Sequence, residues 1–217
     1  MLNVLRNPVG PIQANAFIAW DAAPGEAILV DAGAEASRLL AELASRDLAL
    51  VAILQTHAHG DHIGALDEIV AATGATVYLH ADAEAMLRSP TVNLSAFAGM
   101  PVRASVPYRA VGEGDRLDLL GREVHVYETP GHAPGSVSYY VPAEGIVFTG
   151  DALFAGSIGR TDFPGGSFEV LVSGIRDKLF ALPDDTVVHP GHLDSTTIGR
   201  ERRTNPFLQE TFDPGRR

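Results

Sequence analysis

The stretch Leu54–Gly64, LQTHAHGDHIG, places three histidines and an aspartate within six positions, from His57 to His62. These polar positions come just after residues 48–55, LALVAILQ, a short continuous apolar run of the kind that forms a buried strand. Polar groups beside a buried strand are costly unless they have partners. The pattern therefore predicts a buried strand that ends in a loop of chemically engaged side chains.

The spacing of these residues indicates what kind of loop it is. Side chains two positions apart on a helix diverge by about 200°, so His57 and His59 could share a ligand only on an extended segment. Asp61 lies where the next helix is expected to begin, and aspartate is a good N-cap residue. Imidazole and carboxylate groups together suit zinc, iron and manganese. We therefore interpret His57, His59, Asp61 and His62 as candidate metal ligands, the alternative being an exposed polar loop with Asp61 as a plain cap.

The same arrangement of strand, sharp turn and ligand-type residue recurs three times later in the chain. His132 follows Pro130-Gly131, Asp151 follows Gly150, and His192 follows Pro190-Gly191. We expect these three side chains to converge with the first cluster at one edge of a sheet. The other histidines lack this context. We expect a strand-end or capping role for His80 and a solvent-facing position for His125. For His189 we expect either a supporting position behind the ligands or a packing role.

Hydrophobic periodicity predicts mixed strands and helices through both halves of the chain. No linker separates them, so we expect one domain over residues 1–217. Residues 90–114 are irregular and rich in proline and glycine, which suits either a lid over the site or a long connection. Strands are predicted at 15–20, 26–33, 48–55, 136–141 and 145–151, a hairpin at 115–132, and helices at 34–46, 63–74 and 167–182.

Composition limits the classes of function. The chain has no cysteine, which excludes thiol nucleophiles, disulfides and cysteine-based metal sites. Its net charge of −11 disfavours nucleic-acid and anionic-membrane partners. The first residues show no basic region followed by an apolar run, and no segment approaches 18 uninterrupted apolar residues. We therefore expect a cytoplasmic protein with no nucleic-acid or membrane partner; the sequence carries no signal for an oligomeric state.

The segments THAHGDH, TPGHAPGS, FTGD and PGH, in this order, resemble the metallo-β-lactamase superfamily. The resemblance implies an α+β fold, an αββα sandwich with a metal site at one edge of its two sheets. It also implies two ions bridged by Asp151, with Asp31 as a support behind the ligands. By position, the first ion would be held by His57, His59 and His132, and the second by Asp61, His62 and His192.

Two longer segments, GDALFAGSIGRTDFPGGS and PGH followed by TTIGRERRTNPFL, resemble the short bacterial glyoxalase II-like proteins, the hydroxyacylglutathione hydrolase group. That resemblance implies hydrolysis of a small, glutathione-linked thioester such as S-lactoylglutathione by a hydroxide that bridges two divalent ions. Zinc is the expected metal, and iron or manganese also fit the ligand types. Asp61 would additionally orient the hydroxide. Arg160 would attract a substrate carboxylate, or else simply pair with Asp162 on the surface.

One alternative function uses the same residues differently. The segment GRTDF also occurs in persulfide dioxygenases of this superfamily, which the chain resembles in the histidine-rich loop. Those enzymes use a single iron held by two histidines and one aspartate, which here would be His57, His132 and Asp151. Two histidines and a carboxylate also form the general pattern of oxygen-activating iron sites.

Overall fold

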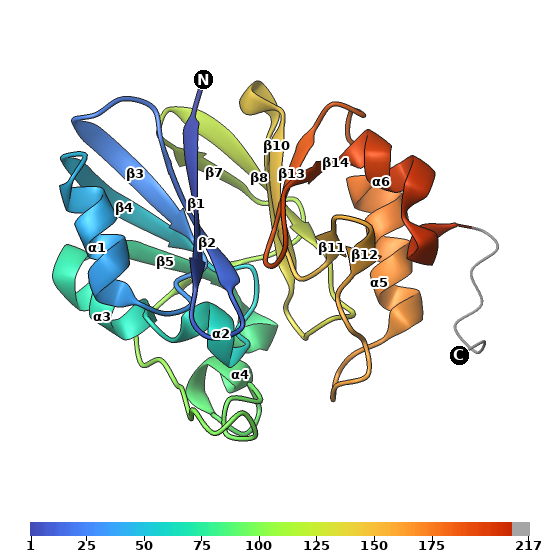
Figure 1. Ribbon diagram of the computed structural model, residues 1–217, viewed down its shortest axis with the longest axis horizontal. Helices are drawn as coiled ribbons and strands as arrows, with labels where there is room; N and C mark the ends of the chain where they lie inside the picture. The colour runs from blue at the N-terminus through green and yellow to red at the C-terminus, as the bar shows by residue number, and fades with distance from the viewer. Residues whose placement is uncertain (210–217) are drawn as a thin grey trace.

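The computed structural model describes residues 1–209, in which two mixed β-sheets pack face to face between outer helices (Figure 1). The first sheet has six strands in sequential order, and its β1–β2 and β2–β3 pairs are antiparallel, whereas β3 to β6 run parallel. Parallel neighbours need a crossover connection, which the intervening helices provide. The strands are β1 (Asn3–Val9), β2 (Ala14–Trp20), β3 (Gly25–Val30), β4 (Leu48–Leu54), β5 (Thr76–His80) and β6 (Arg109–Val111).

The second sheet, within the same described residues, also has six strands, in the order β14-β13-β10-β9-β8-β7. The predicted hairpin at 115–132 is confirmed as the antiparallel pair β7–β8. A short two-stranded ribbon, β11–β12, lies beside this sheet. The bounds are β7 (Arg116–Leu119), β8 (Arg122–Glu128), β9 (Val137–Val141), β10 (Ile146–Gly150), β11 (Leu153–Phe154), β12 (Ser157–Ile158), β13 (Val187–Pro190) and β14 (Thr196–Thr197).

The helices follow the apolar periodicity, with two differences from the sequence prediction. The segment predicted as one helix at 63–74 is split into α2 and α3, and α3 ends at Gly74 with a φ of 69°. The helix predicted at 167–182 starts as α5 and continues as a π-helical turn, η3. The bounds are α1 (Ala36–Ala44), α2 (Gly60–Ile63), α3 (Leu66–Thr73), η1 (Ala81–Ala83), α4 (Glu84–Arg88), η2 (Pro142–Glu144), α5 (Phe168–Gly174), η3 (Ile175–Leu179), α6 (Ile198–Thr204) and η4 (Pro206–Leu208).

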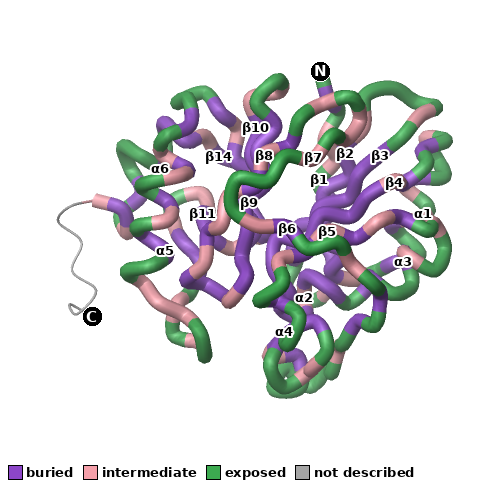
Figure 2. The backbone as a smooth tube through the Cα atoms, turned by 180° about the vertical axis from the view of Figure 1, so that it is seen from behind, coloured by how far each residue is buried: buried purple, intermediate pink, exposed green. Residues whose placement is uncertain are grey.

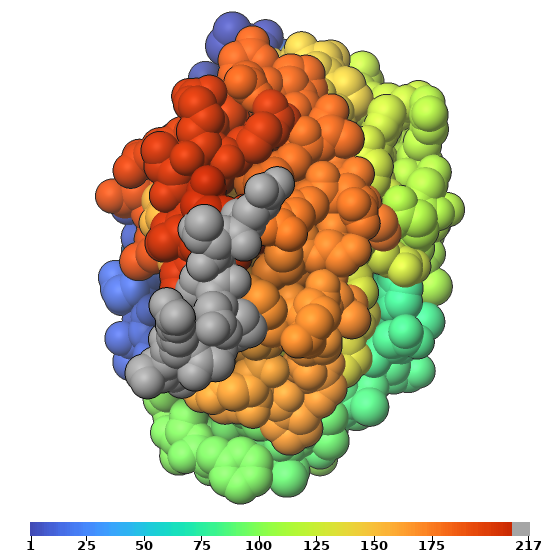
Figure 3. Space-filling model, turned by 90° about the vertical axis from the view of Figure 1, so that its right-hand side faces the viewer, coloured from blue at the N-terminus to red at the C-terminus, as the bar shows by residue number. Residues whose placement is uncertain are grey.

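Three layers of buried apolar side chains hold these elements together. The middle layer lies between the sheets and includes Phe17, Tyr139 and Phe148. One outer layer joins the first sheet to α1, α3 and α4, and the other joins the second sheet to α5 and α6. Buried stretches accordingly run along the strands of both sheets in Figure 2, and α5 and α6 form the orange and red outer surface in Figure 3. The predicted αββα sandwich is therefore confirmed.

The irregular segment 90–114 contains one short strand, β6, and otherwise connects α4 to the sheet without regular structure. It packs against the histidine-rich loop, because the amide of Gly60 donates to the carbonyl oxygen of Asn93 at 3.2 Å. A Cβ built on Gly60 would lie 2.5 Å from the side chain of Ser95. The segment thus supports the loop that carries the candidate ligands.

Candidate metal centre

Four strands deliver the candidate ligands to one edge of the sandwich. His57 follows the end of β4, His132 follows β8, Asp151 follows β10 and His192 follows β13. The β10–β13 pair is parallel, so both strands end on the same side. The two sheets meet here, because the amide of Val137 donates to the carbonyl oxygen of Thr56 at 2.8 Å. Topology therefore brings together residues that are up to 135 positions apart, from His57 to His192.

The first group of ligand-type atoms comes from His57, His59 and His132, which are buried and offer atoms that all lie within 4.8 Å of one another. Nδ1 of His59 faces Nε2 of His132 at 2.9 Å. Nδ1 of His132 donates to the carbonyl oxygen of Arg160 at 2.8 Å, which leaves its Nε2 with a lone pair. This group has the three nitrogen donors of a typical zinc site.

The second group comes from Asp61, His62 and His192, whose ligand atoms also lie within 4.8 Å of one another. Nε2 of His192 lies 3.2 Å from Oδ2 of Asp61, and Nε2 of His62 lies 3.5 Å from the same oxygen. This group is the more open of the two, since the side chains of Asp61 and His192 are 25% and 21% exposed. A bound substrate could therefore approach from this side.

Asp151 lies between the two groups. Its Oδ2 is 3.5 Å from Nε2 of both His132 and His192, and its Oδ1 is 3.5 Å from Nε2 of His62. One carboxylate thus faces one histidine of the first group and two of the second. The structure therefore brings together all seven residues that the sequence suggested as ligands.

Unpaired polar atoms test whether these residues fit a metal. Among the described residues, the buried side-chain atoms without a hydrogen bond are Nε2 of His57, Nε2 of His62, Oδ1 of Asp151 and one threonine hydroxyl elsewhere. Buried polar atoms rarely go unpaired, yet three of these four converge on this edge. Their nitrogen and oxygen donors suit a divalent metal, so the site fits the ions that the sequence predicted.

Hydrogen bonds behind the ligands orient them, and Asp31 is the main acceptor, as the sequence suggested. It accepts from the Thr56 amide and hydroxyl at 2.8 Å each, and from Nδ1 of His62 at 2.9 Å. Because the Thr56 hydroxyl donates to Asp31, it accepts from Nδ1 of His57 at 3.1 Å. Both histidines are thereby held with Nε2 directed into the site.

Gln55 is a supporting residue that the sequence analysis missed. It is fully buried, its Nε2 donates to the carbonyl oxygen of His62 at 2.9 Å, and its Oε1 accepts from the Ala32 amide at 3.0 Å. The signal was present, since Gln55 is the polar end of an apolar strand. Its partners lie on other segments, however, and the strand pattern alone does not identify them.

The electrostatic environment keeps two imidazoles of the first group, those of His57 and His59, neutral. Burial and the neighbouring imidazoles, chiefly that of His62, hold the pKa of His57 well below its usual range. Burial, together with the nearby His132, lowers the pKa of His59 to about 3. Neutral imidazoles have free lone pairs, which is the state that a metal requires.

The second group, in contrast, concentrates negative charge. Burial alone would lower the pKa of His62, but Asp61, Asp151 and Asp31 raise it to about 10. Burial alone would raise the pKa of Asp61, yet His62 and His192 lower it below its usual range. Three carboxylates that together favour a proton on a buried imidazole also favour a metal cation in its place.

The helix that follows the loop begins differently from the prediction. The sequence offered Asp61 as an N-cap in the alternative to a metal site, but the N-cap of α2 is His59 and Asp61 lies in the first turn. The capping position needs extended backbone angles, and His59 has them, with φ −61° and ψ 151°. This arrangement frees the Asp61 carboxylate to face His62 and His192.

Arg160 lies beside the first group but its guanidinium is already paired. Its Nε and Nη2 each lie 2.7 Å from an oxygen of Asp162, and its Cζ lies 3.7 Å from the ring centroid of Phe163. The Phe163 ring is in turn 6.1 Å from that of His59. The surface pairing suggested as an alternative is therefore present, and it places the arginine at the mouth of the site.

The other histidines have structural positions. Nδ1 of His80 caps η1 by accepting from the Asp82 amide, and His189 packs against the rings of Phe17 and Phe148. His125 is partly exposed and pairs with Glu123. All three predictions for them are in line with these positions.

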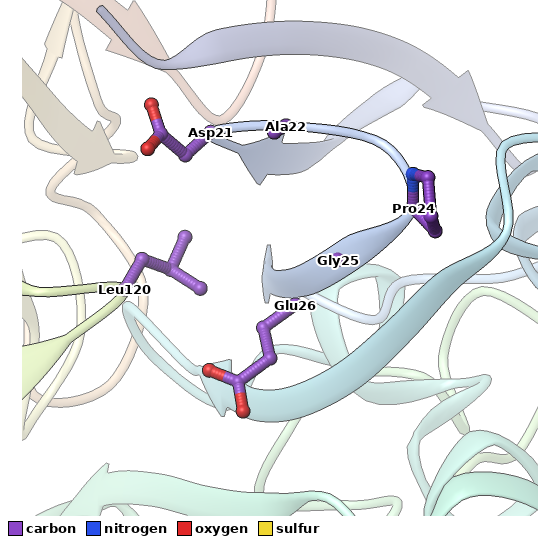
Figure 4. Close-up of a pocket in the computed structure, with 6 residues that line it drawn as sticks. All are labelled: Asp21, Ala22, Pro24, Gly25, Glu26 and Leu120. Atoms are coloured by element: carbon purple, nitrogen blue, oxygen red, sulfur yellow. The ribbon is translucent and has the colours of Figure 1, made fainter.

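A surface pocket lies at the opposite end of the sandwich (Figure 4). It is lined by Asp21, Pro24, Glu26 and Leu120, around the turn that joins β2 to β3. The ligand cluster lies near the start of β2 and beyond the end of β3, so this pocket is separate from the metal centre. No helix of the described residues has the length and apolar content to cross a membrane.

Comparison with known families decides the relationship. The family model described as "Metallo-beta-lactamase superfamily" matches residues 9–192. The chain belongs to the metallo-β-lactamase superfamily. This superfamily member is 42% identical over 205 residues to "Probable metallo-hydrolase YqgX" of Bacillus subtilis, covering 94% of this chain and 96% of that protein. It is 38% identical over 209 residues to "Hydroxyacylglutathione hydrolase GloC" of Haemophilus influenzae, covering 95% and 98%.

Solved structures of other members of the metallo-β-lactamase superfamily show the same fold. The structure of "BLEG-1 B3 metallo-beta-lactamase" matches with a TM-score of 0.90 and 40% identity, over 96% of this chain and 99% of that one. "TTHA1623 in a di-iron-bound form" matches with a TM-score of 0.83 and 41% identity, over 94% and 100%. "ETHE1 from Myxococcus xanthus" matches with a TM-score of 0.75 and 30% identity, over 94% and 83%.

Proposed function

We propose that this protein hydrolyses thioesters of the S-lactoylglutathione class at a centre of two divalent metal ions. The observation that carries the proposal is the pair of ligand groups joined by Asp151, whose two oxygens face both groups at 3.5 Å. A hydroxyacylglutathione hydrolase is 38% identical over almost the whole chain, and a structure titled as di-iron-bound is 41% identical. The hydrolase supports a small-molecule substrate, and the di-iron structure supports two ions.

Metal ions bound here would supply a hydroxide near neutral pH and would stabilise the charge that develops on a carbonyl oxygen. The chain's own residues make the remaining contributions. Asp61 is one of the more exposed candidate ligands, so its carboxylate can orient the attacking oxygen. A thiolate leaves readily, so the reaction needs no dedicated proton donor.

Arg160 is proposed as a substrate-positioning residue. Asp162 and the Phe163 ring hold its guanidinium beside the first group. The Arg160 side chain is 56% exposed, so it can attract a carboxylate of a glutathione-linked substrate. Exposed charges attract weakly and are screened by salt. Arg160→Ala should therefore raise KM while leaving the metal content unchanged.

We further propose zinc as the metal, because three imidazoles and an open neighbouring position are a common zinc arrangement. Iron and manganese accept the same ligands. A glutathione-linked substrate would place the protein in the cytoplasm, with no membrane or nucleic-acid partner.

The test is a parallel assay of the purified, metal-analysed protein. One arm follows S-lactoylglutathione hydrolysis by loss of thioester absorbance, and the other follows oxygen uptake with glutathione persulfide. We expect thioester turnover, no oxygen uptake and two metal ions per chain. One iron per chain, with oxygen uptake and no thioester turnover, would instead establish the dioxygenase alternative based on His57, His132 and Asp151.

A second candidate substrate is a β-lactam, which the 40% identity to BLEG-1 favours. The same two-ion centre could serve either carbonyl compound. The two substrates differ in the leaving group, which is a thiolate in the thioester and an amine, a poorer leaving group, in the β-lactam. A third arm with a chromogenic cephalosporin separates them, and we expect a kcat/KM far below that for the thioester.

A further inference from the structure

Asn15 is a buried polar residue at the metal end of β2 that no ligand assignment includes. Its side chain is 2% exposed, and its Nδ2 donates to the carbonyl oxygens of Pro190 and Leu193, at 2.9 Å each. Its backbone amide donates to the carbonyl oxygen of Gly191 at 2.7 Å. Asn15 therefore holds the backbone on both sides of His192, and it does so from the opposite sheet.

His192 depends on its backbone more than His57, His62 and His132 do. Nδ1 of His57, His62 and His132 each has a hydrogen-bond partner behind the site. For His192, in contrast, the hydrogen bonds found within residues 1–209 include none to Nδ1. The direction of its Nε2 is therefore set by the path of residues 190–193.

That path needs external support. Leu193 has a φ of 67°, a left-handed backbone conformation that is unfavourable for a residue with a Cβ. Besides Asn15, Nη1 of Arg6 donates to the Leu193 carbonyl oxygen at 2.8 Å. Both donors come from β1 and β2 of the first sheet, so the turn after β13 is fastened across the sandwich.

We propose that Asn15 is a positioning residue that controls occupancy of the second metal position, the one formed by Asp61, His62 and His192. The inference rests on the two-ion centre of the proposed function. Asn15 makes no bond to the first group or to the residues that orient it, so its loss should leave that position intact. Removing such an outer partner typically weakens metal binding about 10- to 100-fold.

The test is a zinc titration of the metal-free protein, followed by metal analysis after dialysis. Wild type should bind two ions. Asn15→Ala and Asn15→Asp should bind the first ion unchanged and the second about 10- to 100-fold more weakly, leaving about one ion after dialysis. Asp keeps the shape of Asn but cannot donate to both carbonyls. If only Asn15→Ala lost affinity for the second ion, and Asn15→Asp did not, the hydrogen-bond assignment would therefore be overturned.

Asn205→Ala is the matched control, because Asn205 is also buried and its Nδ2 also bridges two acceptors, Ser157 and Glu201. None of its hydrogen bonds involves a candidate ligand, and it should keep both ions. Two ions bound with wild-type affinity in both Asn15 variants would overturn this inference alone. A single ion in wild type would overturn the two-ion centre itself, and this inference with it.

If the Asn15 variants fail to fold, Arg6→Met decides the question. Arg6 is 37% exposed and reaches the same Leu193 carbonyl from the solvent side. The variant should bind the second ion a few-fold more weakly and the first ion with unchanged affinity. Unchanged affinity for both ions in Arg6→Met would then overturn the proposal.

Discussion

At the scale of single residues, the centre is defined by buried atoms that the protein leaves unpaired. Within residues 1–209, Nε2 of His57, Nε2 of His62 and Oδ1 of Asp151 have no hydrogen-bond partner. The opposite nitrogen of each of these histidines is bonded, to Thr56 and Asp31 respectively. The fold therefore places lone pairs in a dry position, where only a cation or a bound ligand can satisfy them.

Asp151→Ala tests the residue that joins the two ligand groups. Its loss should abolish thioester turnover and weaken metal binding by more than about 100-fold, since removing even an outer partner costs 10- to 100-fold. Metal analysis after dialysis and an activity assay provide the measurement. The exposed strand residue Asp118 offers the control Asp118→Ala, which should behave as wild type. Wild-type metal content and rate in Asp151→Ala would show that the ligand assignment is wrong.

Gly191→Ala tests how closely the backbone approaches the centre. A Cβ at this position would lie 2.1 Å from Oδ1 of Asp151 and 2.8 Å from Cε1 of His62. We expect the methyl group to displace one or both side chains and to lower metal content and activity. Gly174→Ala is the control, because its nearest neighbour would be 3.9 Å away and it lies in a helix. That variant should keep its metal and gain up to about 1 kcal/mol of stability.

The residue types in the sequence predicted the candidate ligands, but they did not identify the residues that support these ligands through hydrogen bonds. Histidines and aspartates after sharp turns are recognisable in the sequence because their chemistry is unusual at such places. Asn15 bonds the backbone carbonyls of Pro190 and Leu193, and Gln55 bonds the carbonyl of His62 and the amide of Ala32. The local sequence pattern contains no information about these partners. The long-range pairing of strands has to be known before their role can be seen.

At the scale of elements, the ends of strands position the candidate ligands, and the bounds of the helices depend on contacts with other segments. The prediction of a helix at 63–74 was wrong at its start, because the helical segment is interrupted after Ile63, where the Ala65 amide donates to the carbonyl oxygen of Ala32 at 2.9 Å. Periodicity identified the buried face of that region correctly, since Leu66 and Ile69 are buried. The break coincides with this contact to Ala32, which periodicity does not report.

His189 in β13 predicts a pH-dependent contribution to stability. Burial between Phe17 and Phe148 lowers its pKa to about 4, against an ordinary value of 6.5. Between these values the unfolded chain binds a proton and the folded chain does not, so stability rises with pH. The unfolding free energy of wild type minus that of His189→Phe should therefore increase by about 1–2 kcal/mol from pH 5 to pH 7.

Chemical denaturation at both pH values, on metal-free protein, measures this difference. His125→Gln, which removes a partly exposed histidine of β8 in place of a core one, is measured in the same way as the control. If the difference in unfolding free energy between wild type and His189→Phe were the same at pH 5 and pH 7, the imidazole would not be held neutral by the core.

At the scale of the whole molecule, the mixture of strands and helices could be predicted because its signals are distributed along the chain, whereas the αββα sandwich was implied by the family resemblance. Apolar runs predicted strands at 48–55 and 145–151, and alternating apolar residues predicted a hairpin at 115–132. Which strand lies beside which was available only through the family resemblance. A single domain over 1–217 stays a prediction, since the structure describes residues 1–209.

The central claim is that two metal ions together carry out hydrolysis, and a metal titration of activity tests it most directly. Metal-free protein is given increasing zinc, and S-lactoylglutathione turnover is measured at each ratio of zinc to chain. We predict little activity at one equivalent and full activity only at two, because the proposed centre holds one ion in each ligand group. Full thioester turnover at one equivalent, with no further rise at two, would contradict the account.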